Sequence, residues 1–428
     1  MESYFGKVRW AMFQPLIGGC ALGAEQSFGT KPTCVIDYEG VANSELYLDY
    51  QKNVKNTELK HFVIDGGAYS LAKDLKKDEE GNPIYNWTDP ELQNLDVVCG
   101  VPICAGLSSA NTQSATSSEN GMGRGSDAKQ NNNMLGMLDI TLNILKPKVY
   151  IFENAYKLAT PLGAGIKEKL VKMANDAGYA TNIVKVNTMN HGLPQNRTRT
   201  FFVAYKGEFA PEMTFEALPV PSIMDVLKGL PKQEGAFQER SNDDGWIKYL
   251  KDKFGDNYRE EWAKRHSAAD FLADMEGELE YAKKYFGEKG QKDIDYFLSK
   301  KAMGKGWMSG APLYFGTHKL PSLYGRSMGR CWHPVEDRGY SIRECMRLMA
   351  LPDDFPTVPK GKVGMIGQNV PVCTAAYYAD QVLKYLNGEL KMTNQLNIEQ
   401  DFCSTNALKD PKKTKAIPMT GFTAMLKK

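Results

Sequence analysis

The 428-residue chain is predicted to be an α/β protein, with a Rossmann-like domain built on a mostly parallel sheet and a smaller irregular domain. Two observations predict this fold. Short apolar runs alternate with helical patterns up to residue 205, and several runs end in glycine, an acidic residue or a cysteine. The chain then changes to charged, aromatic-rich helical segments and a Gly/Lys/Trp-rich stretch at 300–310. We expect one domain at 1–205, completed by 356–390, a second at 206–355, and a mobile basic tail at 391–428.

The composition is that of a soluble globular protein, with 42% hydrophobic and 24% charged residues. No apolar run approaches the roughly 18 residues needed to cross a bilayer, and the N-terminus lacks a signal-peptide pattern. We therefore expect a cytoplasmic protein with no membrane partner. The scattered cysteines form no metal-binding spacing, so we expect them to be reduced and no metal to be bound. Because the net charge is only +2, any nucleic acid must be held by locally concentrated basic groups.

A glycine-rich turn follows the first apolar run, at residues 8–13. Ile17, Gly18 and Gly19 open a helical pattern there, where glycines let a cofactor approach backbone N–H groups at a helix N-terminus. A tight turn with no ligand explains the same residues equally well. This pattern by itself is a weak indication of a cofactor site.

Acidic residues follow the next two strands. The strand at 33–36 leads to Asp37 and Tyr38, about 20 residues after the glycine turn, where Asp37 would accept hydrogen bonds from ribose hydroxyls and Tyr38 would lie on a purine face. The third strand, at 61–64, leads to Asp65, which could meet an adenine amino group. For each residue the alternative is an ordinary position at a strand end or in a loop.

The fourth apolar run breaks at Gly100 and Pro102 and presents Cys104 to a loop rich in Ser, Gly and Asn. Such a cysteine is a nucleophile, a ligand or a buried filler. The polar stretch at 109–129 is too long for a simple connection and is expected to be a lid or binding loop, with disorder as the alternative. A later strand, at 149–152, delivers Glu153 to the same edge of the sheet.

Taken in order, these stretches resemble the cytosine-5 DNA methyltransferase family over nearly all of residues 8–386. The Pro-Pro-Cys-Gln-Gly-Phe-Ser loop of that family resembles 102–108, its Glu-Asn-Val motif 153–155, and its Gln-x-Arg-x-Arg motif 195–199. An Arg-x-x-Ser/Thr-x-Arg-Glu block ending in Pro-Asp-x-Phe matches 338–355, and Gly-Asn-x-Val-Pro resembles 367–371. No single motif establishes the resemblance to this family. The occurrence of all five motifs in the family's order does.

Three departures from the family pattern stand out. The Phe-x-Gly-x-Gly cofactor motif reads Gln14-Pro15-Leu16-Ile17-Gly18, so its aromatic residue and first glycine are replaced. Ala105 follows the cysteine where glutamine is usual, and Gln368 stands where asparagine is usual. The first change bears on the cofactor, and the second on how the loop holds DNA.

The resemblance implies an enzyme that uses S-adenosylmethionine to methylate carbon 5 of cytosine in double-stranded DNA, after the base is flipped out of the helix. It implies that Cys104 adds to C6, that Glu153 protonates N3, that Arg199 holds the O2 side of the base and that Arg197 braces the site. The cofactor contacts that it implies are Ile17, Gly18, Gly19, Asp37, Tyr38, Asp65, Pro102 and Gln368. The DNA contacts are Ser108, Gln195 and Arg338.

Sequence choice is expected to reside at about 233–332, in a monomer with a possible partner restriction endonuclease. One alternative keeps the fold but changes the substrate or donor: an RNA cytosine-5 methyltransferase, or a transferase using a modified adenosylmethionine. A second alternative is a DNA-binding protein with a decayed site. The joint presence of Cys104, Glu153, Arg197 and Arg199 argues against the decayed site.

Overall fold

The computed structural model describes residues 3–40, 43–64, 71, 87–108, 125–230, 251–263, 320–323, 331, 333–336 and 338–403. Asp65, most of the polar stretch at 109–129, most of the expected sequence-reading region and the chain after residue 403 lie outside the described residues. Among the described helices, none is long and apolar enough to span a bilayer.

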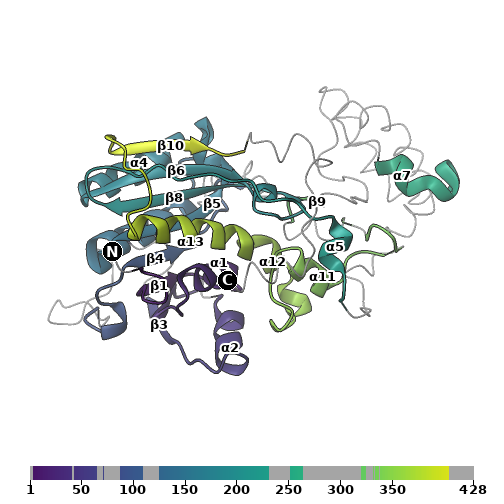
Figure 1. The fold of residues 1–428 in the computed structure, drawn as a ribbon, viewed down its shortest axis with the longest axis horizontal. Coiled ribbons are helices and arrows are strands. Elements are labelled where there is room, and N and C mark those ends of the chain that lie inside the picture. The colour runs from purple at the N-terminus through teal and green to yellow at the C-terminus, as the bar shows by residue number, and fades with distance from the viewer. Residues whose placement is uncertain are drawn as a thin grey trace.

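An eight-stranded sheet organises the described part of the chain, in the order β10-β6-β8-β5-β4-β1-β2-β3 (Figure 1). Neighbouring strands are parallel except for β8, which runs antiparallel to both β5 and β6. The predicted mostly parallel α/β sheet is therefore confirmed. Its strands are β1 (Trp10–Phe13), β2 (Cys34–Tyr38), β3 (Lys60–Ile64), β4 (Val97–Gly100), β5 (Val149–Ala155), β6 (Tyr179–Asn187), β8 (Thr198–Lys206) and β10 (Asn397–Asp401), and a separate pair joins β7 (Gln195–Asn196) to β9 (Leu320–Pro321).

Helices cover both faces of the sheet. Successive strand residues point to opposite sides, and both sets of side chains are apolar and must be buried. In β1, Trp10 and Met12 join one buried cluster, while Ala11 and Phe13 join the other. Helices α1 (Gly19–Phe28) and α13 (Val372–Leu386) lie side by side on the first face, as Figure 1 shows. The second face is covered by α3 (Asn132–Asp139), the π-helical turn η5 (Ile140–Leu145) and α4 (Ala164–Asp176).

The remaining helices lie around this sandwich. The longer ones are α2 (Glu45–Asn53), α5 (Ile223–Leu227), α7 (Tyr258–Ala263), α11 (Ile342–Arg347) and α12 (Gly364–Gln368). Short 3-10 turns are η2 (Pro90–Leu92), η4 (Lys129–Asn131), η6 (Tyr156–Ala159), η7 (Pro161–Gly163), η8 (Thr188–Asn190), η9 (Gly255–Asn257) and η12 (Lys360–Lys362).

Two features of the structure bear on the expected domain boundaries. Residues near both ends of the expected second domain, among them Ile223, Val226, Met346 and Leu348, belong to the same buried cluster as residues of α1 and α13. Side chains from 206–230 and 338–355 thus pack into the same core as the expected first domain. Residues 397–401, which fall in the expected mobile tail, form β10, a parallel edge strand beside β6 (Figure 1).

Candidate active site

Cys104 lies just beyond the carboxyl end of β4, next to the point where the strand order reverses between β1 and β4. In open α/β sheets this edge is where ligands bind. A turn holds the cysteine, since the Leu107 N–H donates to the Cys104 carbonyl at 3.0 Å. Cys104 is partly exposed, as is Cys403, whereas the other cysteines are buried.

Glu153 lies in β5, the strand beside β4, and forms an ion pair with Arg199 of β8. Glu153 Oε1 is 2.9 Å from Arg199 Nε, and the glutamate is 5% exposed in its side chain. The antiparallel register pairs Glu153 with Phe201 and Ala155 with Arg199, so Glu153 and Arg199 are diagonal neighbours within reach of long side chains. Register therefore fixes the ion pair at the sheet edge that also carries Cys104.

The electrostatics of this cluster couple its members. Burial raises the pKa of the Glu153 carboxyl, although the positive charges of Arg199 and Arg197 oppose the shift. Loss of solvation also raises the pKa of the Cys104 thiol, and the negative charge of Glu153 adds to that effect. Burial thus shifts the Glu153 carboxyl towards its protonated form, and the Cys104 thiol ionises more easily when Glu153 is uncharged.

Arg197 is fully buried and acts as a brace. Its guanidinium donates to the carbonyl oxygens of Leu323 and Gly367, each at 2.8 Å, and of Asn369 at 2.9 Å. Burial lowers its pKa to about 9. The Arg197 side chain therefore links the residue before β8 to the segment that follows β9 and to the end of α12.

A family model for C-5 cytosine-specific DNA methylases matches residues 67–384. The chain belongs to this family. Among similar proteins, M1.HphI, a type II methyltransferase of Haemophilus parahaemolyticus, is 24% identical over 69% of this chain and 70% of its own length. M.NaeI of Lentzea aerocolonigenes is 30% identical, but over only 22% of this chain and 23% of its own length, and M.Sau96I of Staphylococcus aureus is 26% identical over 58% and 53%.

The fold comparison agrees with the family. The crystal structure of a protein named as a DNA modification methyltransferase, encoded within an E. coli prophage, superposes with a TM-score of 0.55. The superposition covers 89% of this chain and 100% of the other chain, at 19% sequence identity. The likeness is therefore one of fold alone.

The glycine turn of this C-5 cytosine-specific DNA methylase is shaped by packing. A Cβ on Gly18, whose φ is 103°, would lie 2.5 Å from the Tyr47 ring, and one on Gly19 would lie 2.1 Å from the Val370 carbonyl oxygen. Leu16 replaces the first glycine of the motif yet keeps a φ of 55°, a conformation that costs a non-glycine residue roughly 1–2 kcal/mol. The turn therefore has the backbone form that glycine would adopt, although one glycine is missing.

The late Gly-Asn-x-Val-Pro motif contacts this turn through an unexpected residue. The Gly19 N–H donates to Asn369 Oδ1 at 2.9 Å, and Asn369 is buried, whereas the expected residue, Gln368, is exposed. Ile17 was also expected at the cofactor, but its side chain is fully buried in the core, so only its backbone remains available.

Two expected cofactor contacts, Asp37 and Tyr38, are buried at the end of β2. Asp37 is fully buried, and its Oδ2 accepts a hydrogen bond from the Ser44 hydroxyl and lies 2.8 Å from His61 Nε2, so it is not placed for a ribose. Tyr38 is fully buried with its ring 5.4 Å from that of Phe13, so it does not offer a face to a purine. The exposed acidic residue at this strand end is Glu39, which sequence reasoning did not select.

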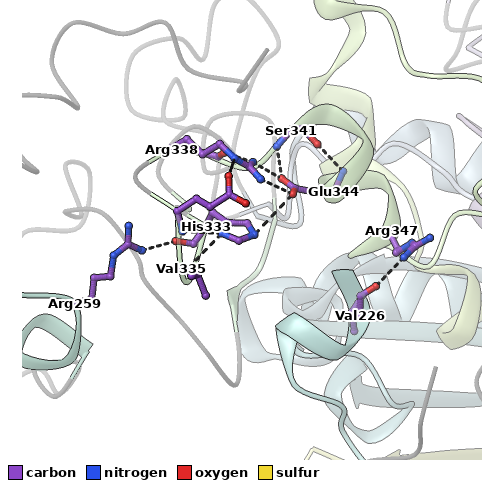
Figure 2. Close-up of polar contacts among 10 residues, drawn as sticks. Val226, Arg259, His333, Val335, Arg338, Ser341, Glu344 and Arg347 are labelled. Carbon is purple, nitrogen blue, oxygen red and sulfur yellow. Dashed lines mark hydrogen bonds and ion pairs between the residues drawn. The ribbon is translucent and has the colours of Figure 1, made fainter. Parts of the chain in front are cut away.

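Two of the expected DNA contacts, Gln195 and Arg338, are bonded to other groups of the chain. Gln195 is fully buried, and its amide bonds to the Leu348 carbonyl at 3.3 Å and to the Leu323 N–H at 3.0 Å. Arg338 forms a bidentate pair with Glu344 at 2.8 and 2.9 Å, and a further bond to Glu336 at 2.7 Å (Figure 2). Two carboxylates thus bind the Arg338 guanidinium in this structure.

The other expected residues stay candidates. Ser108 is partly exposed at the last described position before the gap, with its N–H on the Ala105 carbonyl at 3.3 Å. Pro102 is buried beside Cys104, and its carbonyl accepts from the Asn154 amide at 3.4 Å. Within the described residues no group of acidic, cysteine and histidine side chains could hold a metal ion.

Proposed function

We propose that this chain transfers a methyl group from S-adenosylmethionine to carbon 5 of cytosine in double-stranded DNA. One observation carries the proposal. A partly exposed cysteine beyond β4 adjoins a buried glutamate of β5 that is paired with an arginine of β8, on the edge of an α/β sheet where ligands bind. Family membership and the shared motifs support the same reaction.

Cysteine addition overcomes the low nucleophilicity of cytosine C5. Attack of the Cys104 thiolate on C6 forms a sulfur–carbon bond and pushes the electron pair of the C5–C6 double bond into the ring. Protonated Glu153 gives its proton to N3 as that charge develops, so C5 gains enamine character. Arg199 stabilises the charge on the O2 side of the base. Once C5 carries the methyl group, the C5 proton is lost to water or hydroxide and the thiolate is expelled from C6. N3 then returns its proton to Glu153, which restores both the ring and the acid.

The residues around the glycine turn fit an adenosyl donor that carries a carboxylate and ribose hydroxyls. The first turn of α1, which the structure describes in full, contains no acidic side chain. The partial positive charge of this helix end can therefore attract the carboxylate of the donor. Glu39, in place of Asp37, is the exposed acceptor for the hydroxyls. When bound, S-adenosylmethionine supplies an electrophilic methyl group. Because Leu16 retains the glycine-like backbone, the altered motif does not by itself argue for another donor.

The target base must leave the stacked duplex, since C6 is shielded within it, at a cost of a few kcal/mol. The relatives are named as type II methyltransferases, which supports a role in restriction-modification beside a partner endonuclease. Such an enzyme would act on DNA in the cytoplasm of a bacterium. RNA methylation remains the alternative substrate class for the same chemistry.

Bisulfite sequencing of DNA from cells expressing the protein tests the proposal and reveals the target sequence together. We expect protected cytosines in one sequence context with the wild-type protein and none with Cys104→Ser. In vitro, DNA and tRNA compete for label from S-adenosylmethionine, and the mass of the modified base identifies the transferred group. Transfer to tRNA alone, or a mass gain other than one methyl group, would contradict the proposal.

A further inference from the structure

Two buried asparagines hold the segment that carries Cys104, and neither belongs to the motifs discussed above. Asn133 is 0% exposed and Asn131 is 1% exposed. Both lie where η4 meets the start of α3. Asparagine is a poor helix former because its amide competes for nearby backbone groups. Here neither side chain caps its own helix, so the amides serve another segment.

Asn133 holds the segment on the N-terminal side of the cysteine. Its Oδ1 accepts the Ile103 N–H at 2.7 Å, in the peptide unit directly before that of Cys104. On the preceding residue, the Pro102 carbonyl accepts from the Asn154 amide at 3.4 Å. The backbone entering the cysteine turn is thus bonded on consecutive residues to α3 and to the end of β5.

Asn131 holds the segment on the other side of the turn. Its Nδ2 donates to the carbonyls of Gly125 at 2.7 Å and Ser126 at 3.0 Å, and the Gly125 N–H donates to the Gly106 carbonyl at 2.9 Å. A Cβ on Gly106 would lie 2.6 Å from the Ala128 Cβ and 2.7 Å from Asn131 Oδ1. The turn is therefore pressed against the same short segment that Asn131 orders.

We propose that Asn133, together with Asn131, is a positioning residue that fixes the backbone of the Cys104 turn for attack on the base. The inference rests on the proposed function, in which Cys104 is the nucleophile. Both amides are neutral, so they order the turn without altering the charge balance among Glu153, Arg197 and Arg199. A displacement of about 1 Å at the reacting atom costs on the order of 100-fold in rate, so loss of a backbone anchor should affect attack more than binding.

Asn133→Ala tests the role, with Asn143→Ala as the matched control. Asn143 lies in η5, is exposed, and bonds only at the surface to Asp139 at 2.6 Å. For Asn133→Ala we expect the rate of covalent adduct formation with 5-fluorocytosine-containing DNA, and kcat, to fall on the order of 10- to 100-fold. The Kd values for DNA and S-adenosylmethionine should stay within about twofold of wild type, as should all constants of the control.

Stability is measured in parallel, because Asn133→Ala leaves the partly buried Ile103 N–H without this acceptor. Assays are run well below the Tm of each variant, and Asn131→Ala provides a second test if Asn133→Ala does not fold. A folded variant that forms adduct at the wild-type rate would overturn the inference and leave the proposed function intact. A loss of adduct that follows DNA or donor binding alone would also overturn it. Failure of the wild-type protein itself to form adduct would overturn both.

Discussion

Replacing Arg197 with methionine should destabilise the protein more than most single substitutions do. The guanidinium donates to three carbonyl oxygens, those of Leu323, Gly367 and Asn369, at 2.8 to 2.9 Å. Each such bond from a charged donor contributes about 1.5–3 kcal/mol. The cost of burying the cation, visible in its pKa of about 9, offsets part of that sum. We therefore expect the free energy of unfolding to fall by about 3–5 kcal/mol, because three carbonyl oxygens lose their donor.

Urea unfolding measures this change, with the slope m checked so that the shift in midpoint reflects stability. Arg9→Met is the matched control, because Arg9 also donates to two backbone carbonyls, those of Pro90 at 2.9 Å and Gln93 at 3.4 Å, but is exposed. We expect that control to change stability by about 0.5 kcal/mol or less. A change of under about 1 kcal/mol in Arg197→Met would refute the brace role assigned to this arginine.

Three further predictions concern other residues. Burial lowers the pKa of His191 to about 3 from an ordinary 6.5, so the unfolded chain binds a proton that the folded one does not, and stability should fall as pH drops from 6.5 towards 3, by up to about 1.4 kcal/mol per unit. In His191→Phe the slope of a pH series of urea midpoints should flatten, and an unchanged slope would exclude His191 as its source. Ser341→Ala removes the capping box with Glu344 and should cost about 1 kcal/mol in thermal unfolding, whereas no loss would contradict the role of that cap. Glu153→Gln should abolish methylation yet speed alkylation of Cys104 by iodoacetamide at a fixed pH at which the wild-type Glu153 is ionised, because the amide lacks the negative charge that raises the pKa of the thiol; slower alkylation would contradict the coupling.

The sheet and the position of the site could be predicted from the sequence. The apolar runs predict the strands, and the chemically active residues that follow those runs predict where the site lies. Cys104 and Glu153 lie at the ends of neighbouring strands, as expected of parallel strands whose carboxyl ends share one edge. The strand β10 could not be found this way. Its sequence, from Asn397 to Asp401, is polar because an edge strand with one exposed face needs few apolar residues.

Individual contacts depend on side-chain direction, which a motif does not reveal. Asp37 and Glu39 both accompany the end of β2, yet only Glu39 is exposed, because the strand buries both of its faces up to Tyr38. Gln195 is occupied by backbone groups of Leu323 and Leu348, more than a hundred residues away in sequence. The same polar residue types form hydrogen bonds within a protein and hydrogen bonds to DNA. The sequence alone therefore could not distinguish the two roles.

The most direct test of the account is the covalent bond between Cys104 and cytosine. A duplex containing the target sequence found by bisulfite sequencing, with 5-fluorocytosine at the target, is incubated with the protein and S-adenosylmethionine. Fluorine at C5 blocks the final elimination, so the adduct persists. Peptide mass spectrometry should place the DNA on Cys104 in the wild type and in Cys403→Ser, which removes the other partly exposed cysteine, and should find no adduct in Cys104→Ser. An adduct on any other residue, or undiminished methylation by Cys104→Ser, would contradict the account.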